Sequence, residues 1–222
     1  MKFFVESVTL AWRVVSPTIE ADEIDACIHD LVTRYEEPHR YYHTLAHIVD
    51  LLRVIKSEIP ESHFDEIGEH EVARLILMCA YHDVICVPLA SGCEELSALY
   101  FGDIARGNGV NTTDILSVER GIAASKDHAV RPLTLSETEH VFLDADISAF
   151  WRSNKATFAA DVNALVVEAE AVGVTQQEFI ERRKAFLVRL LKESGGEIYR
   201  SKFFVRQNKI ACRKIRAQIK GC

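Results

Sequence analysis

EHEVARLILMCAYHDV, residues 69 to 84, decides the fold of this chain. The segment begins polar and then becomes apolar on every side, which is typical of a helix that is covered by neighbouring elements all round. The chain of 222 residues is long enough to bury a sizeable core around such a helix, so a metal is not needed merely to hold the fold together. We therefore expect residues 69–84 to form the central helix of the protein.

The segments on both sides of this helix also carry apolar residues at helical spacing. In residues 22–35 and 44–56 these residues form one stripe in each segment. Ser136 and Glu139 form a capping box at the start of another predicted helix. No alternating stretch of useful length indicates a strand. Further helices are expected at about residues 94–105, 112–128, 136–151, 155–171, 175–193 and 202–219.

The predicted fold is therefore an all-α bundle with a single domain over residues 1–222. Its core covers about residues 31–150, and the helices at about residues 155–219 pack on this core. No repeat, low-complexity tract or linker divides the chain.

Composition is that of a soluble globular protein, with 48% hydrophobic and 27% charged residues. No apolar run approaches the roughly 20 residues that span a bilayer. Glu6 and Arg13 interrupt the first segment, so it does not resemble a signal peptide. We expect a cytoplasmic protein with no membrane partner.

The six cysteines, at positions 27, 79, 86, 93, 212 and 222, lack paired short spacings. This pattern favours reduced thiols over a disulfide framework. Cys86 and Cys93 are a conceivable zinc pair, but no C-x-x-C motif supports a zinc site.

The net charge of −7 is unevenly distributed. Residues 1–181 hold 13 Lys and Arg against 31 Asp and Glu, whereas residues 182–222 hold 13 against 2. A basic segment of this kind binds nucleic acid in some proteins, although a solvated helix face that balances an acidic body is the simpler and favoured explanation. Its basic residues include Arg200, Lys202, Arg206, Lys209, Arg213, Lys214, Arg216 and Lys220.

Two histidines lie one helical turn apart in RYYHTLAHIVDLL, residues 40 to 52. His43, His47 and Leu51 form a row beside the apolar stripe, so both imidazoles are able to face inward. An HxxxH pair alone is weak evidence for a metal, because a partly buried histidine is more often satisfied by a backbone carbonyl.

His82 and Asp83 end the most apolar segment of the chain. An uncompensated carboxylate there would cost several kcal/mol or become protonated, so a cationic group should lie beside Asp83. The segment FLDADISAF contributes a further acid. Asp146 shares a helical row with Phe142 and is expected to face the core, whereas Asp144 is expected to face solvent.

Together, His47, His82, Asp83 and Asp146 supply two imidazoles and two carboxylates from three helices. This set suits Mn²⁺, Fe²⁺, Co²⁺, Ni²⁺ or Zn²⁺, with Mg²⁺ as a further possibility, better than Ca²⁺ or a metal that selects thiolates. For Asp146 alone, a structural salt bridge or a helix cap is an equal alternative.

HTLAHIVDLL, LILMCAYHDV and FLDADIS resemble the H…HD…D pattern of the HD superfamily of metal-dependent phosphohydrolases. With EPHRYYHTLAHI, EELSA, SKDH and ERRKAFLVRLL, the chain looks similar to an uncharacterised bacterial branch of that superfamily from about residue 31 almost to its end. The resemblance implies a helical bundle around one or two metal ions. The implied metal ligands are His47, His82, Asp83 and Asp146.

The chain departs from this branch at several positions. Cys86 and Val87 precede Pro88 where the branch has different residues, and Cys93 precedes Glu94. Glu168 stands where the branch has an arginine. These departures leave the implied metal ligands unchanged and affect the positions where substrate contacts are expected.

The implied reaction is hydrolysis of a phosphate ester by metal-activated water, with a nucleotide or similar small molecule as substrate. Asp83 is expected to take part in catalysis, and Glu94 or Glu95 is expected to orient the water or move its proton. Both glutamates have the alternative of being exposed acids in the first turn of a helix.

Four further residues have candidate roles around this site. Arg40 and Lys126 are candidates for binding the substrate phosphate, although a solvated surface role is the simpler explanation for Lys126. His43 and His128 are candidates for outer-shell donors or for a second metal site, and His128 has the equal alternative of capping backbone carbonyls.

Two other functions fit the same sequence. A di-iron oxygenase on the same scaffold would require His43 or His128 as a ligand. A nucleotide- or nucleic-acid-binding module would use the basic C-terminal segment and keep the metal as a structural element. The sequence carries no signal for the oligomeric state.

Overall fold

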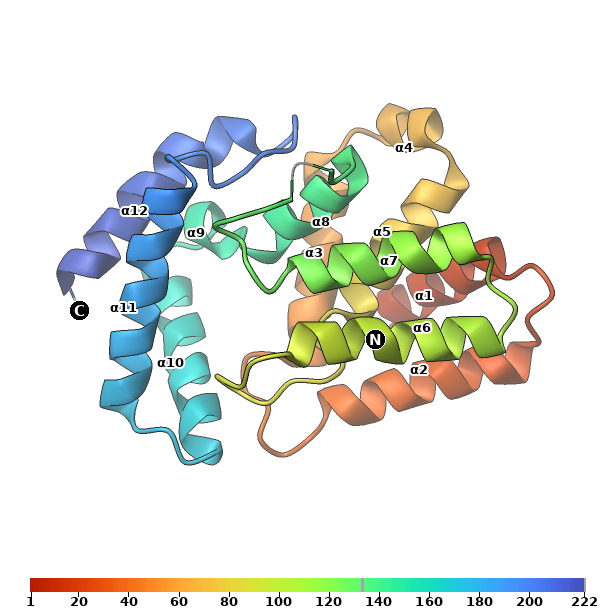
Figure 1. The fold of residues 1–222 in the computed structure, drawn as a ribbon, viewed down its shortest axis with the longest axis horizontal. Coiled ribbons are helices and arrows are strands. Elements are labelled where there is room, and N and C mark those ends of the chain that lie inside the picture. The colour runs from red at the N-terminus through yellow and green to blue at the C-terminus, as the bar shows by residue number, and fades with distance from the viewer. Residues whose placement is uncertain (133, 222) are drawn as a thin grey trace.

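The computed structural model describes residues 1–132 and 134–221, and all regular secondary structure in this part is helical, without a strand (Figure 1). This confirms the predicted all-α class. The helices are α1 (Lys2–Val15), α2 (Ala21–Tyr35), α3 (Leu45–Glu58), α4 (Glu61–Ile67), α5 (Glu69–Tyr81), α6 (Cys93–Gly107), α7 (Thr112–Ala124), α8 (Glu137–Asp146), α9 (Ala149–Arg152), α10 (Lys155–Ala171), α11 (Gln176–Glu193) and α12 (Asn208–Gly221), with one 3-10 turn at Val205–Gln207.

The helix α5 is the centre of the bundle. It contacts α1, α3, α4, α6, α7 and α8. Its side chains from Leu77 to Tyr81 are all buried, as the apolar sequence predicts. The helix ends at Tyr81, earlier than expected, and His82 is its C-cap. His82 and Asp83 therefore lie at the end of the most deeply buried helix, where their side chains are held in place by the surrounding core.

One contiguous apolar core extends from Phe4 in α1 to Ile215 in α12. A smaller cluster of Val166, Ala169 and Phe179 joins α10 to α11. In Figure 1, α10, α11 and α12 stand together on one side of the bundle formed by the preceding helices. The C-terminal helices thus pack on the core, and the second half of α11 contributes Leu187 and Leu190 to it.

Further helix boundaries differ from the expectation, and the helix expected from residue 202 begins at Asn208. The capping box of Ser136 and Glu139 is present, but the helix it begins ends at Asp146. Ile147, with φ −94° and ψ 18°, ends α8, and the short α9 follows. The segment 112–128 is helical only to Ala124. Apolar spacing continues through both breaks, which is why periodicity alone joins the pieces.

Asp144 corrects a prediction. It was expected to face solvent, yet its side chain has no exposed surface. It pairs with Arg131 and accepts hydrogen bonds from the backbone N–H groups of Arg200 and Ser201. Periodicity identifies the face of α8 on which Asp144 lies, but the segment after α11 covers that face as well.

The basic C-terminal segment is partly bound to the rest of the molecule. Arg206 pairs with Glu58, and the Lys214 ammonium donates to the carbonyls of Trp151 and Ser153. The exposed basic residues on α12 are Lys209, Arg213, Arg216 and Lys220.

Cysteines 27, 79, 86, 93 and 212 are free thiols, and Cys222 lies outside the described residues. None of the helices in the described part of the chain has the length and apolar character needed to cross a membrane.

Candidate metal centre

Three helix ends and one loop bring the predicted ligands together. His47 comes from the first turn of α3, His82 and Asp83 follow α5, and Asp146 is the last residue of α8. His47 Nε2 lies 3.3 Å from Asp146 Oδ1 and 3.9 Å from Asp83 Oδ2. His82 Nε2 lies 2.9 Å from Asp83 Oδ2 and 3.5 Å from Asp146 Oδ1. The four side chains therefore converge on one small volume.

The ring nitrogens at this point lack hydrogen bonds although they are buried. Nε2 of His47 and Nε2 of His82 make no hydrogen bond of good geometry, although carboxylate oxygens lie 3.3 and 2.9 Å away. Buried polar atoms are nearly always paired, so these two nitrogens require an explanation. His82 Nδ1 donates to the carbonyl of Cys79 at 3.0 Å, because a carbonyl can only accept. In the neutral imidazole, His82 Nε2 then carries the lone pair that a metal ligand needs.

The electrostatics show that this volume favours positive charge. Burial alone would lower the pKa of His82, but the charges of Asp83 and Asp146 raise it well above its usual range. Burial alone would raise the pKa of both carboxyl groups, but the neighbouring histidines hold each pKa below its usual range. Two carboxylates therefore remain ionised and call for a cationic partner, as predicted for Asp83.

His128 joins the same group. It lies beyond the end of α7, is buried, and places Nε2 at 3.0 Å from Asp146 Oδ2. Asp146 thus faces three imidazoles, those of His47, His82 and His128. This position agrees with the predicted role of His128 beside the metal ligands. It does not agree with the alternative, in which His128 caps backbone carbonyls.

His43 lines the same cavity as this group, and its ring centroid lies 6.1 Å from that of His47, but its hydrogen bond goes to a different partner. Its Nδ1 donates to Glu168 Oε1, and Glu168 Oε2 accepts the backbone N–H groups of Tyr41, Tyr42 and His43 at 2.8, 2.8 and 3.0 Å. Glu168 is 1% exposed, and these contacts lower its pKa to about 2 in spite of its burial. Glu168 therefore fixes the segment that leads into α3 and His47.

Arg40 corrects a second prediction. Its guanidinium has no exposed surface and donates to the carbonyls of His43, Asp83 and Val84 and to the Glu37 carboxylate. Four of its five N–H groups are used within the protein and the side chain is fully buried, so it is not placed to bind a substrate phosphate. Instead, it joins the segment before α3 to the turn that carries Asp83.

The two glutamates at the start of α6 separate into different positions. Glu94 lines a cavity of about 220 Å³ together with His47, His82 and Asp83. Glu95 pairs with Lys126 at the surface, and that ion pair lowers the pKa of the Glu95 carboxyl. Only Glu94 lies beside the candidate metal ligands. Glu95 and Lys126 lie at the surface, which was the simpler alternative for Lys126.

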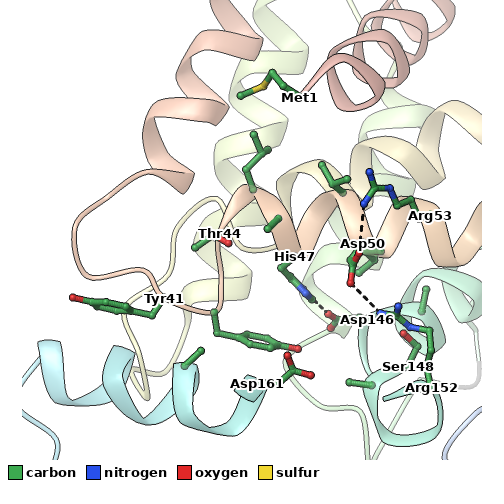
Figure 2. Close-up of a pocket in the computed structure, with 18 residues that line it drawn as sticks. Met1, Tyr41, Thr44, His47, Asp50, Arg53, Asp146, Ser148, Arg152 and Asp161 are labelled. Atoms are coloured by element: carbon green, nitrogen blue, oxygen red, sulfur yellow. Dashed lines mark hydrogen bonds and ion pairs between the residues drawn. The ribbon is translucent and has the colours of Figure 1, made fainter. Parts of the chain in front are cut away.

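His47 and Asp146 also line a larger cavity, of about 580 Å³ (Figure 2). Arg152 and Arg53 line it, and both approach Asp50, at 3.2 and 3.9 Å. The side chains around His47 are therefore accessible from a space large enough for a small molecule.

Sequence reasoning did not single out Glu168 as a positioning residue, or Arg152 and Asp161 as cavity residues. Asp161 borders both cavities, and burial raises the pKa of its carboxyl. Glu168 lies on α10, whose apolar stripe is weak, so local periodicity gave no sign that this residue is buried. Nothing in the local sequence connects Arg152 with α3.

The chain matches no model of a known protein family, no curated protein and no solved structure.

Proposed function

We propose that this protein is a metal-dependent phosphohydrolase that acts on a small phosphate ester such as a nucleotide. The observation that carries the proposal is the convergence of His47, His82, Asp83 and Asp146 on one volume, with buried Nε2 atoms that have no hydrogen-bond partner. The resemblance of these residues to the H…HD…D pattern supports the same class of reaction.

The residues fit a divalent transition metal. The donors are imidazole nitrogens and carboxylate oxygens, without a thiolate, which suits Mn²⁺, Fe²⁺, Co²⁺, Ni²⁺ or Zn²⁺ and permits Mg²⁺. His128 extends the donor set to three imidazoles. A divalent ion bound there supplies a Lewis acid and a bound water with a lowered pKa.

The chain's own residues then have separate tasks. The Cys79 carbonyl holds the ring of His82 in one tautomer, and Arg40 holds the turn that carries Asp83. Glu94 borders the cavity beside the ligands and is the candidate to accept a proton from water.

The larger cavity is the proposed place of the substrate's remaining atoms. Arg152 and Arg53 share one carboxylate, Asp50, and together the three carry a net positive charge. A guanidinium binds phosphate or carboxylate oxygens in a bidentate manner, so this end of the cavity suits a second anionic group on the substrate. Arg152 and Arg53 replace Arg40 in the proposed substrate contacts.

The test is metal analysis of the purified protein by mass spectrometry, together with phosphatase and phosphodiesterase assays on nucleotides with Mn²⁺, Co²⁺, Ni²⁺, Mg²⁺ or Fe²⁺ added. We expect about one transition metal per chain and metal-dependent phosphate release, both lost in Asp83→Ala. Asp103→Ala, which removes an exposed acid of α6, is the matched control. Full metal content and activity in Asp83→Ala would overturn the proposal, whereas two irons and no phosphate release would favour the oxygenase.

A further inference from the structure

The C-terminal helices α10 and α11 form one wall of the cavity of about 220 Å³ that the candidate metal ligands line. The residues that they contribute to this wall are Phe158, Asp161, Leu165, Arg183 and Phe186. Among the described residues that line the cavity, Arg183 is the only lysine or arginine. The wall therefore brings a permanent positive charge to a cavity that otherwise holds carboxylates and imidazoles.

Aromatic rings hold the Arg183 guanidinium at this wall. Its central carbon lies over the ring of Phe158, 5.7 Å from the ring centroid. The Phe158 ring in turn lies 6.2 Å from the Phe150 ring of α9, centroid to centroid. A guanidinium at such a distance from an aromatic face is attracted to it, and its planar set of N–H donors matches phosphate oxygens. Both rings line the cavity, so the charge of Arg183 is held beside it.

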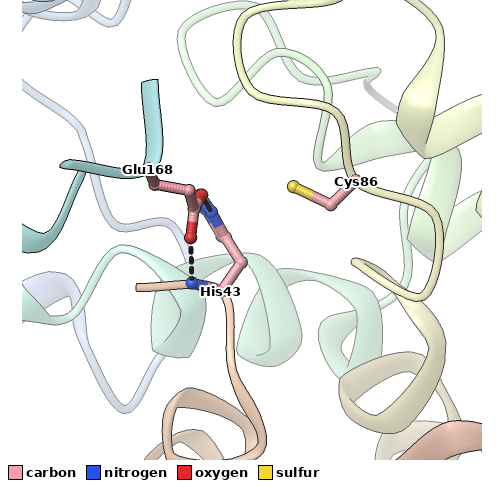
Figure 3. A group of neighbouring side chains, drawn as sticks. All are labelled: His43, Cys86 and Glu168. Atoms are coloured by element: carbon pink, nitrogen blue, oxygen red, sulfur yellow. Dashed lines mark hydrogen bonds and ion pairs between the residues drawn. The ribbon is translucent and has the colours of Figure 1, made fainter. Parts of the chain in front are cut away.

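The wall is fixed to the segment that precedes α3. Glu168 of α10 accepts three successive backbone N–H groups of that segment with one oxygen and bonds to His43 with the other. In Figure 3 the Cys86 sulfur of the loop after α5 points toward this pair, and one nitrogen, oxygen or sulfur atom of each of the three residues lies within 4.8 Å of the others. The smaller apolar cluster joins α11 to α10. Arg183 therefore has a set position relative to the metal ligands.

A phosphate group that enters this cavity meets several carboxylates. A divalent ion would offset Asp83 and Asp146, but Glu94 and Asp161 also line the cavity. The phosphate oxygens add negative charge, and in phosphoryl transfer this charge is spread over the oxygens of the transferred group. Guanidinium groups aimed at these oxygens are a recurrent means of stabilising them. Arg183 is placed to supply that charge.

The two cavities beside the metal ligands meet at shared residues. Those that line both are Tyr42, His47, Asp146, Ala149 and Asp161. Arg183 lines only the smaller cavity, whereas Arg53 and Arg152 line only the larger one. A substrate bound at the shared residues therefore has basic side chains in both cavities.

We propose that Arg183 binds the phosphoryl group on which the enzyme acts, and that the wall of α10 and α11 is thereby part of the substrate site. The inference rests on the proposed function and assigns the two cavities different parts of one substrate. The phosphate beside Arg183 is the one released, and the second anionic group lies with Arg53 and Arg152.

The experiment measures binding of inorganic phosphate to the metal-loaded full chain by isothermal titration calorimetry. Arg183→Gln should raise the dissociation constant at least about tenfold, because hydrogen bonds to charged groups are the stronger ones in proteins. Arg183→Lys should recover part of the affinity, since an ammonium keeps the charge but not the bidentate geometry. Arg182→Gln is the matched control, because Arg182 is the exposed preceding residue of α11 and does not line the cavity. Metal content should equal that of the wild type in all three variants.

A second measurement uses the wild type alone and so does not depend on the folding of a variant. Phenylglyoxal modifies accessible arginines, and peptide mass spectrometry reports each position. Inorganic phosphate should slow the modification of Arg183, which is partly exposed, and leave that of Arg182 unchanged.

The outcomes separate this inference from the proposed function. An unchanged dissociation constant in Arg183→Gln with metal retained, or no protection of Arg183 by phosphate, would overturn the role of Arg183 alone. The phosphohydrolase proposal would still stand, because it is judged by the metal content and phosphate release of the wild type and Asp83→Ala. A wild type that binds no metal would overturn both.

Discussion

Asp144 and Asp146 are two carboxylates on one helix, α8, the first without exposed surface and the second 14% exposed, and their surroundings differ in kind. Asp144 is satisfied by the protein, since Arg131 neutralises its charge and two backbone N–H groups complete its hydrogen bonds. Asp146 instead faces His47, His82 and His128, and the inward-facing nitrogens of His47 and His82 have no hydrogen-bond partner.

The difference separates a structural acid from a candidate metal ligand. A buried carboxylate that has a guanidinium and N–H donors holds elements together, here α8, the segment before it and the segment after α11. Where a bound ion supplies the positive charge, the carboxylate is instead surrounded by imidazoles whose lone pairs are free to bind that ion. Burial and a short contact to a basic residue are common to both, so neither property identifies a metal site.

The largest expected effect comes from removing Asp144. Asp144→Ala leaves the Arg131 guanidinium buried without its partner, since both side chains have no exposed surface. Breaking a buried pair in this way costs about 3–5 kcal/mol, and we expect a loss of that size in the free energy of unfolding, measured with urea. Asp103→Ala should change it little. If Asp144→Ala also removed metal affinity from the folded protein, the structural role of Asp144 and the metal-binding role of Asp146 would not be separate.

The next effect sharpens the role of Asp146. A divalent ion that binds only the folded state raises the free energy of unfolding by about 2.7 kcal/mol at a hundred times its dissociation constant. We expect thermal unfolding of the chelator-treated protein to shift upward with Mn²⁺ or Co²⁺ and to lose this shift in Asp146→Asn. An equal shift in wild type and Asp146→Asn would place the bound ion elsewhere.

A smaller effect is expected at the cavity arginines. Hydrogen bonds to charged groups contribute about 1.5–3 kcal/mol, so Arg53→Gln with Arg152→Gln should lower kcat/KM at least about tenfold for a substrate that carries a second phosphate. A substrate with a single phosphate should be less affected. Arg206→Gln, which breaks a surface pair with Glu58, serves as the matched control.

The smallest effect is a pH dependence at Glu168. Its pKa falls from 4.5 to about 2 in the folded protein, so its contribution to stability is present above pH 4.5 and is lost as the pH falls towards 2. The stability difference between wild type and Glu168→Gln should therefore shrink between pH 5 and pH 3 in urea unfolding. A difference that stays constant over this range would mean that the Glu168 carboxylate charge contributes nothing.

Apolar periodicity predicted the helices well because it reports one property of each segment, the face that it buries. The central position of α5 follows from its apolar residues on every side. The same reasoning failed at Asp144 and at the break after Asp146, because neither depends on the segment alone. Asp144 is buried by residues about 56 positions later in the chain, and the helix break does not interrupt the apolar pattern.

The candidate site shows the same division. The sequence identified His47, His82, Asp83 and Asp146 as candidate ligands from their positions beside apolar stripes and from their resemblance to a known pattern, and the fold brings all four together. It also proposed Arg40 as a phosphate contact, because an arginine in a motif carries no sign of whether its guanidinium is already bonded. The three carbonyls that it binds are known only once α3 and the turn after α5 are adjacent.

The sequence by itself determined the helical class, the buried central helix and the residue types of the candidate metal site, because these depend on apolar spacing and on side-chain chemistry within each segment. Only the tertiary structure decided which acids are satisfied, which histidines keep a free nitrogen, and that Glu168 and Cys86 meet at His43. Hydrogen bonds and charge pairs between distant residues depend on distances and angles that no local pattern encodes.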